Sequence, residues 1–198
     1  MPNWATNTAR FSGKEEIIEL IVNAIDDKGN FDFNMIDAIP EELRRITAPP
    51  EVISEKEYEA LPDKEKWGID NDRRYITQKE HDDFMRKYGA VDWYDWSVEN
   101  WGTKWSACRT SILSKKEGEV IIEFETAWQE PSGIYETLSK KFGIDILAGV
   151  IYEDGDEFDV VFGDYEEFEK IFNVVEEKDY FDENDKENYY IRRYIELR

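Results

Sequence analysis

A large excess of acidic over basic residues is the feature that most limits what this chain can fold into. Its 198 residues include 47 Asp and Glu against 25 Lys and Arg, a formal net charge of −22. Like charges repel one another in a compact state, so the chain must bury enough apolar surface to outweigh that repulsion. Hydrophobic residues make up 40% of it and include seven Trp, eleven Tyr and eleven Phe, whose rings bury large areas. The sequence therefore predicts a globular core beneath an acidic surface.

The same composition argues against several classes of function. Nucleic acids and anionic membranes are held by concentrated Lys and Arg, so we expect neither direct nucleic-acid binding nor membrane binding. Cys108 is the only cysteine, which rules out an intrachain disulfide, and no apolar leader follows Met1. These features predict a cytoplasmic protein. His81 is the only histidine, which disfavours zinc centres and Ser-His-Asp chemistry, and we expect no metal and no cofactor.

Hydrophobic periodicity predicts a mixture of strands and helices. Apolar and polar residues alternate in six stretches, and the predicted strands span residues 3–11, 31–35, 107–114, 119–128, 144–152 and 157–162. A capping box of Ser12 with Glu15 and apolar residues at helical spacing predict a first helix that ends at Gly29. Further helices are predicted at 132–143 and 165–172, with a last strand or helix at 189–197. This order indicates an α+β sandwich, with an antiparallel or mixed sheet and helices on one face.

The character of the sequence changes between about residues 37 and 105. Four prolines interrupt its first part, and two capping boxes predict short helices, Ser54 with Glu57 and Thr77 with Glu80. We therefore expect one domain over residues 1–163 with a helical insertion at about 37–105. An acidic C-terminal extension at 164–198 is expected to pack on that domain.

Several short motifs along the chain are similar to those of one protein family. They are Asn3-Trp4 with Asn7, Tyr94-Asp95-Trp96, the run from Glu99 to Trp105, and Phe124 with Thr126-Ala127-Trp128 and Pro131. In these motifs the chain resembles the YubB-like family over residues 3 to about 163. Two departures are visible, because Ala5 stands where these proteins often have Cys, and Gln129-Glu130 replaces the usual Ser-Pro.

This resemblance implies a ferredoxin-like domain with a split β-α-β architecture and an insertion after the second strand. YubB-like proteins are small proteins of plasmids, phages and other mobile elements, so a mobile-element setting is implied as well. The family has no settled biochemical function, and the resemblance supplies no catalytic residues.

The C-terminal third of the chain concentrates the negative charge. Residues 153–187 contain sixteen Asp or Glu and three Lys, a net charge of −13. An ordinary solubilising surface has such a composition, but carboxylates spaced like phosphates can also occupy a basic nucleic-acid groove. We predict a non-enzymatic mobile-element protein that mimics nucleic acid and inhibits a basic host nuclease, in the manner of an anti-CRISPR or anti-restriction protein. The predicted partner-binding residues are Asp154, Asp156, Glu157, Asp159, Asp164, Glu166, Glu167 and Glu169.

An aromatic segment provides an alternative hypothesis. Trp and Tyr are common anchors of interfaces, so this segment can form a surface for a partner or a small ligand. The same rings can also form the core that attaches the insertion to the sheet. The residues of this alternative surface are Trp96, Trp101, Lys104 and Trp105. The sequence leaves the identity of the partner and the oligomeric state open.

We predict no catalytic residues and no metal site. His81 falls on the apolar face of its predicted helix, where a packed or capping role is expected. Cys108 has only Arg109 nearby to stabilise a thiolate. The acidic residues around Asp154 and Asp182 do not follow the spacing of a calcium-binding loop.

Overall fold

The computed structural model of the chain describes residues 3–66, 72–155, 157–162, 176–177 and 193–194. The chain divides into two compact units. We call residues 1–37 together with 105–198 the sheet unit, and residues 38–104 the inserted unit.

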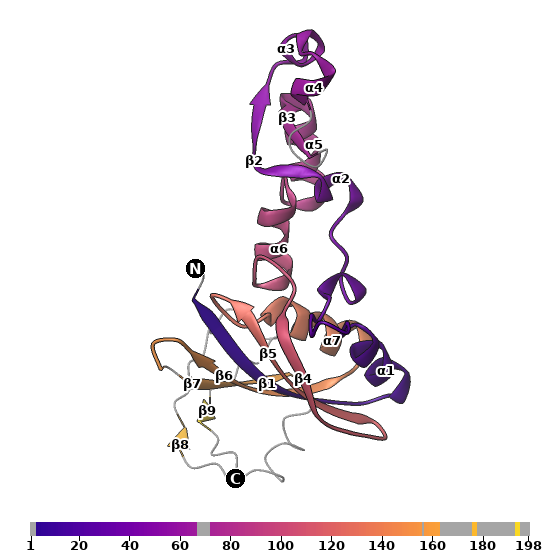
Figure 1. Cartoon of the computed structure of the whole chain (residues 1–198), viewed down its shortest axis with the longest axis vertical. Coiled ribbons are helices and arrows are strands. Elements are labelled where there is room, and N and C mark those ends of the chain that lie inside the picture. Colours follow the sequence, from indigo (N-terminus) through magenta and orange to yellow (C-terminus); the bar gives the residue numbers. More distant parts are fainter. Residues whose placement is uncertain (1–2, 67–71, 156, 163–175, 178–192, 195–198) are drawn as a thin grey trace. The chain divides into compact units, whose positions relative to one another are not determined.

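The sheet unit contains a five-stranded sheet in the order β4-β5-β1-β6-β7. Its strands are β1 (Trp4–Ser12), β4 (Cys108–Lys116), β5 (Glu119–Ala127), β6 (Asp145–Tyr152) and β7 (Glu157–Phe162). Every neighbouring pair is antiparallel. Helices α1 (Glu15–Asn23) and α7 (Ser132–Phe142) lie along one face of the sheet (Figure 1). This is the ferredoxin-like arrangement around a central β1, with β7 added at one edge, and it confirms the predicted α+β fold class.

The core of the sheet unit lies between the sheet and these two helices. Successive side chains of a strand point to opposite faces, and in β1 every second residue from Ala5 to Phe11 is fully buried. The helices add fully buried apolar side chains, each of which stabilises the fold by about 1.5–3 kcal/mol. They are Ile18 and Ile21 of α1, and Ile134, Tyr135 and Leu138 of α7.

The predicted strand at 31–35 is wrong. Phe31 forms only isolated bridges, and residues Phe33–Met35 form one turn of 3₁₀ helix, η1. The Asp32 carboxylate accepts a hydrogen bond from the Asn34 N–H at 3.0 Å, and such local bonds compete with strand pairing. The inserted unit consequently precedes the second strand of the sheet, β4, whereas the resemblance implied an insertion after the second strand.

The predicted ends of the first helix also need correction. Ser12 is the last residue of β1, and α1 begins at Glu15 without a side-chain cap. The Glu15 carboxylate instead accepts a hydrogen bond from the Gly118 N–H at 2.6 Å. The helix ends at Asn23, so Gly29 lies in a later turn. The capping box was therefore misleading because a tertiary contact uses the same carboxylate.

The inserted unit combines short helices with two parallel strands. Its elements are α2 (Glu41–Arg44), β2 (Ile46–Ile53), α3 (Glu55–Ala60), α4 (Asp63–Lys66), β3 (Arg73–Thr77), α5 (Gln78–Tyr88) and α6 (Trp93–Trp101). Both capping boxes predicted for this region are present. The insertion expected to be helical thus contains helices and, in addition, the paired strands β2 and β3, of which β2 includes Pro49-Pro50. Proline cannot donate to a strand ladder, and this pair lies where the register between β2 and β3 shifts.

Little of the C-terminal part belongs to the described residues. Strands β8 (Glu176–Glu177) and β9 (Arg193–Tyr194) form a small antiparallel pair. The predicted helix at 165–172 and most of the predicted extension at 164–198 lie outside the described residues. Within the part of the chain that the structure describes, no helix is long and apolar enough to span a bilayer.

Candidate functional site

One end of the sheet gathers three tryptophans. Trp4 begins β1 and pairs with Ala127, the last residue of β5, so Trp128 follows at the same end. Trp105 shortly precedes β4, and its ring centroid lies 6.5 Å from that of Trp4. The side chains of Trp105 and Trp128 are 38% and 44% exposed. We call Trp4, Trp105, Arg109 and Trp128 the tryptophan end of the sheet.

Arg109 is part of this cluster. Its guanidinium carbon lies 5.3 Å from the centroid of the Trp4 ring, and its Nη1 donates to the carboxylate of Glu125. The cation is therefore attracted both by an aromatic face and by an anion. Arg109 and Trp128 have φ angles of +52° and +73°, a region that costs non-glycine residues about 1–3 kcal/mol. Surrounding contacts must hold these two residues in place.

A buried hydrogen-bond network lies beneath the tryptophan end. Asn7 Nδ2 donates to the Ala5 carbonyl at 3.1 Å and to Thr126 Oγ1 at 3.0 Å. Asn7 Oδ1 accepts from the Tyr135 hydroxyl at 3.1 Å. Burial, together with the nearby Glu130 and Tyr152, raises the pKa of Tyr135 well above its usual value. The phenol thus stays protonated and remains a donor to Asn7.

The network extends to the loop that carries Trp128. Thr126 Oγ1 donates to the Gln129 carbonyl at 2.7 Å, and the Trp128 N–H donates to the Asn3 carbonyl at 2.8 Å. These bonds fix the backbone on both sides of Trp128. They explain how a bulky residue is kept at a positive φ.

The acidic stretch of the sequence begins at the same end of the sheet. Glu153 directly follows β6, and its Oε1 accepts a hydrogen bond from the Trp4 N–H at 3.0 Å. The chain then turns into β7, whose first residue Glu157 pairs with Ile151 of β6. Figure 1 shows this turn beside the start of β1, at the end of the sheet opposite the β4–β5 turn. Strand register therefore brings the tryptophans and the first acidic residues together.

The structure places three of the eight predicted partner-binding acids. Asp154 is exposed in the turn after β6, and Glu157 and Asp159 lie on β7 by their backbone pairing. The other five lie outside the described residues, namely Asp156, Asp164, Glu166, Glu167 and Glu169.

The predicted aromatic surface does not form as proposed. Trp96 and Trp101 are 6% and 1% exposed and pack edge to face at 5.8 Å inside the inserted unit. Their burial removes large apolar surfaces from water, so these two rings belong to the core. Lys104 ends the inserted unit, and Trp105 belongs to the sheet unit. Of the three predicted tryptophans only Trp105 is exposed.

Sequence reasoning missed Trp4 and Trp128 as candidate residues. Both stood in the motifs that carried the family resemblance. Their proximity depends on the pairing of Trp4 with Ala127, two residues that lie far apart in the sequence. Only the strand register places these two residues at the same end of the sheet.

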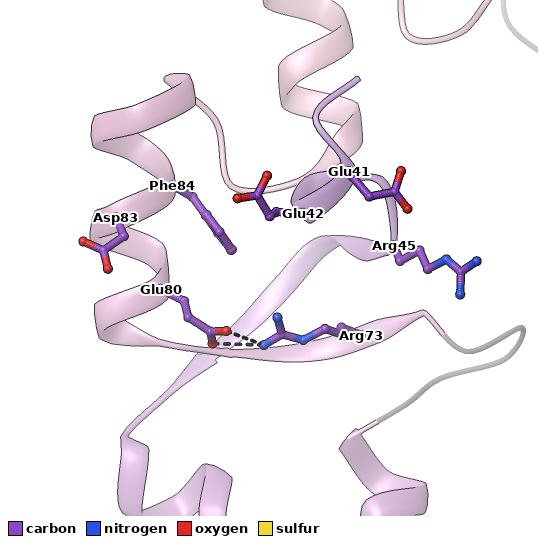
Figure 2. Close-up of a pocket in the computed structure, with 7 residues that line it drawn as sticks. All are labelled: Glu41, Glu42, Arg45, Arg73, Glu80, Asp83 and Phe84. Atoms are coloured by element: carbon purple, nitrogen blue, oxygen red, sulfur yellow. Dashed lines mark hydrogen bonds and ion pairs between the residues drawn. The ribbon is translucent and has the colours of Figure 1, made fainter. Parts of the chain in front are cut away.

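A pocket of about 450 Å³ lies in the inserted unit between α2, β3 and α5 (Figure 2). It is lined by Phe84, Glu41, Glu42, Glu80, Asp83, Arg45 and Arg73. Figure 2 shows Phe84 and Glu42 directed into the space, whereas Arg45 extends away from it. All four lining carboxylates are paired with cations of the chain itself, Glu41 with Arg44, Glu42 with Lys87, Glu80 with Arg73 and Asp83 with Arg86. These pairs give the pocket walls a structural role.

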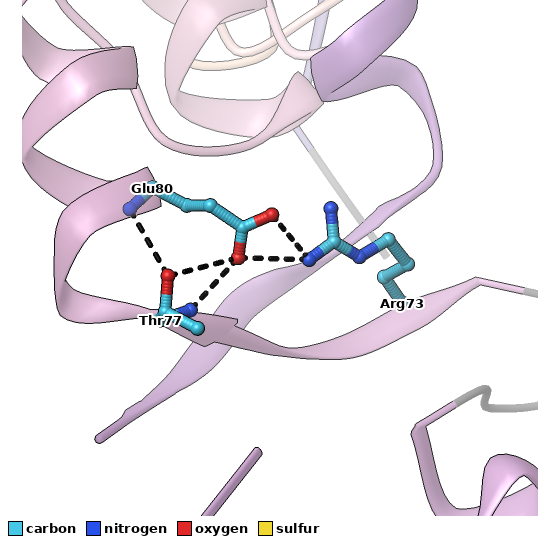
Figure 3. Close-up of polar contacts among 3 residues, drawn as sticks. All are labelled: Arg73, Thr77 and Glu80. Atoms are coloured by element: carbon cyan, nitrogen blue, oxygen red, sulfur yellow. Dashed lines mark hydrogen bonds and ion pairs between the residues drawn. The ribbon is translucent and has the colours of Figure 1, made fainter. Parts of the chain in front are cut away.

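Glu80 joins the elements at the base of this pocket (Figure 3). Its two carboxylate oxygens accept hydrogen bonds from Arg73 Nη2 at 2.8 and 3.0 Å, and Oε2 also accepts from the Thr77 N–H at 2.9 Å. Thr77 Oγ1 accepts in return from the Glu80 N–H at 3.2 Å. Burial is the largest influence and raises the pKa of Glu80, but the bonds from Thr77 and Arg73 outweigh it. The net result is a pKa below the usual value.

We expect Glu80→Gln to lower the free energy of unfolding by about 1–2 kcal/mol at neutral pH. Glutamine can preserve the capping bond, but it leaves the mostly buried Arg73 without its counter-charge. A carboxyl with a lowered pKa contributes stability above its unfolded pKa and loses it as the pH falls through its folded pKa. Wild type should therefore lose this contribution as the pH falls below 4.5, the usual pKa of a Glu carboxyl. The variant should not, because glutamine does not titrate.

Urea unfolding of both proteins, from neutral to acidic pH, measures this difference. Glu59→Gln is the matched control, because Glu59 is an exposed carboxylate on α3 in the same unit. Equal stability of wild type and Glu80→Gln at neutral pH would contradict the assigned role of the ion pair.

The two residues considered for catalysis have ordinary surroundings. His81 Nδ1 lies 3.1 Å from the carboxylate of its neighbour Asp82. Burial and then Glu125 raise the pKa of the Cys108 thiol, against the lowering effect of Arg109. A thiol that stays protonated is a weak nucleophile. Among the described side chains, no three His, Cys, Asp or Glu are grouped so as to hold a metal ion.

Residues 100–190 match the family model of a ferredoxin-like domain in Api92-like protein. The matched range contains β4, β5, α7, β6 and β7, and with them Trp105, Trp128 and the acidic stretch. The match supports the ferredoxin-like part of the resemblance but does not carry the YubB-like name, and it names no activity or ligand. No curated protein and no solved structure matches the chain.

Proposed function

We propose that this protein binds a basic protein partner through the tryptophan end of the sheet and the acidic segment, residues 153–187, that begins there. The observation that supports this best is the strand register, which sets Trp4 beside both Ala127 and Glu153. Tryptophan supplies the apolar anchors that are common in protein interfaces. Carboxylates around such anchors favour a partner of opposite charge.

Ion pairs within the sheet unit support the proposal that the acidic segment binds a basic partner. Six basic side chains of this unit pair with its own carboxylates, namely Arg10, Arg109, Lys115, Lys116, Lys140 and Lys141. The acidic segment itself has three Lys for sixteen acidic residues. Its negative charge therefore exceeds what its own cations can neutralise, and a surface dense in Arg and Lys would complement it.

We place the partner among nucleic-acid-binding proteins, because a groove that holds phosphates is dense in Lys and Arg. In the mobile-element setting that the YubB-like resemblance implies, a host nuclease is such a protein. The acidic segment would occupy the groove as a mimic of nucleic acid and exclude DNA. Blocking of this kind needs no chemical step, so we propose a non-enzymatic inhibitor.

The test starts from tagged full-length protein, which should capture the partner from a bacterial lysate at low salt. The purified pair is then titrated at several salt concentrations. Affinity should fall by at least about a hundredfold between roughly 0.05 and 0.5 M salt, since exposed charges are screened. Duplex DNA should compete for the same site. A complex that is insensitive to both salt and DNA would exclude the mimic.

Charge reversal provides a matched comparison. Four acids of the predicted set, for example Asp154, Glu157, Asp159 and Glu169, are changed to Lys in one variant. The control variant carries the same change at four acids of α3 and α4, Glu55, Glu59, Asp63 and Glu65, and so has the same net charge. We expect the first variant to lose binding and the control to keep most of it. Equal losses would show that only overall charge matters.

A further inference from the structure

We infer that the tryptophan end selects arginine over lysine in the bound partner. This inference rests on the proposed function, since the arginine would belong to the same basic partner. The chain itself shows this kind of recognition at the tryptophan end, where Arg109 lies over the ring of Trp4 while Glu125 accepts a hydrogen bond from its guanidinium. An incoming arginine would meet the same two kinds of group at this end of the sheet.

The exposed rings suit a planar cation. Trp105 is tilted by 44° from Trp4 at a centroid distance of 6.5 Å, and it is 38% exposed. A guanidinium can stack on an indole face with little loss of hydration, whereas the compact ammonium of lysine is strongly hydrated. Trp96 and Trp101 offer no such faces, because both are buried.

Two carboxylates lie at the same end of the sheet as these rings. On one side of β1, the Glu153 carboxylate accepts a hydrogen bond from the backbone N–H of Trp4. On the other side, Glu125 of β5 pairs with Arg109. Carboxylates accept two parallel bonds from a guanidinium, a geometry that lysine cannot provide. An aromatic face flanked by carboxylates therefore discriminates by shape as well as by charge.

Trp128 is held ready for binding. The Thr126–Gln129 and Trp128–Asn3 hydrogen bonds fix its backbone at φ +73°. An anchor that is ordered before binding loses less conformational freedom on association. The strained backbone also identifies a test variant, because glycine adopts this φ without cost.

The experiment titrates full-length protein with two peptides of equal length and charge, one of arginine–glycine repeats and one of lysine–glycine repeats. Affinity is measured by calorimetry, and the indole N–H resonances are followed by NMR. The acidic segment should bind both peptides at low salt. The arginine peptide should bind at least about fivefold more tightly, and the indole resonances of Trp105 and Trp128 should shift while those of Trp96 and Trp101 should not.

Three variants identify the source of the preference. Trp105→Ala and Trp128→Gly should reduce the preference towards equal binding, and Trp128→Gly should do so without loss of stability because it relieves the positive φ. Leu113→Ala, a change at a 54% exposed residue of β4, should keep the preference. Equal affinity for both peptides in wild type, or a preference that survives both tryptophan variants, would overturn the inference and leave the charge-based function standing. Failure of both peptides to bind at low salt would overturn the proposed function as well.

Discussion

Replacing Trp101 by alanine is expected to destabilise the inserted unit by about 3–5 kcal/mol. Trp101 is 1% exposed and is the largest fully buried side chain among the residues that the structure describes, packed edge to face against Trp96. Its loss removes a large apolar area and leaves a cavity that the short helices around it cannot fill. Urea unfolding followed by circular dichroism measures the effect, and limited proteolysis within residues 38–104 reports whether this unit opens first.

Trp105→Ala is the matched control for this prediction. The same substitution is made, but the side chain is 38% exposed, so we expect a loss below about 1 kcal/mol. A result in which both variants lose equal stability would show that Trp101 is not a core residue. The pair also separates a stability effect from a binding effect, because only Trp105 belongs to the proposed binding surface.

The second large effect is expected at Asn7. Asn7→Ala removes three hydrogen bonds in the core and leaves the fully buried hydroxyl of Tyr135 without its acceptor. An unsatisfied buried polar group costs about 1–3 kcal/mol, so with the lost packing we expect a destabilisation of about 2–4 kcal/mol. Chemical unfolding monitored by far-UV circular dichroism measures it.

A double-mutant cycle tests the assigned cause of this loss. Tyr135→Phe removes the stranded hydroxyl, so in the Asn7→Ala background it should cost much less than it does in wild type. Thr8→Ala changes the neighbouring residue on the opposite face of β1 and should cost below about 1 kcal/mol. Strictly additive effects of Asn7→Ala and Tyr135→Phe would refute the network.

Much of the fold was accessible from local sequence patterns. The alternation in residues 3–11 and 119–128 predicted β1 and β5, because a strand with one buried face repeats every second residue. The capping boxes of α3 and α5 were also readable, since each is completed within four residues. Such features depend on neighbours in the chain, and periodicity and spacing express them directly.

Other elements could not be predicted in this way. Residues 31–35 alternate like a strand. The Asp32 carboxylate, however, accepts a hydrogen bond from the backbone N–H of Asn34, and residues Phe33–Met35 form the 3₁₀ turn η1 instead. Pro49-Pro50 concealed β2, which tolerates them where its register with β3 shifts. In the first place a side-chain bond between near neighbours outweighed the alternation, and in the second the pairing of β2 with β3 could not be read from local composition.

The sequence by itself determined the acidic charge, its concentration after residue 152, the α+β class and the wealth of tryptophan. Tertiary structure decided which tryptophans are exposed, because burial depends on what packs against a ring and not on the ring itself. Trp101 and Trp105 lie four residues apart, yet one is core and the other is surface. Only the pairing of β1 with β5 and β6 brings Trp4, Trp128 and Glu153 to one end of the sheet, since strand register joins residues that are distant in the chain.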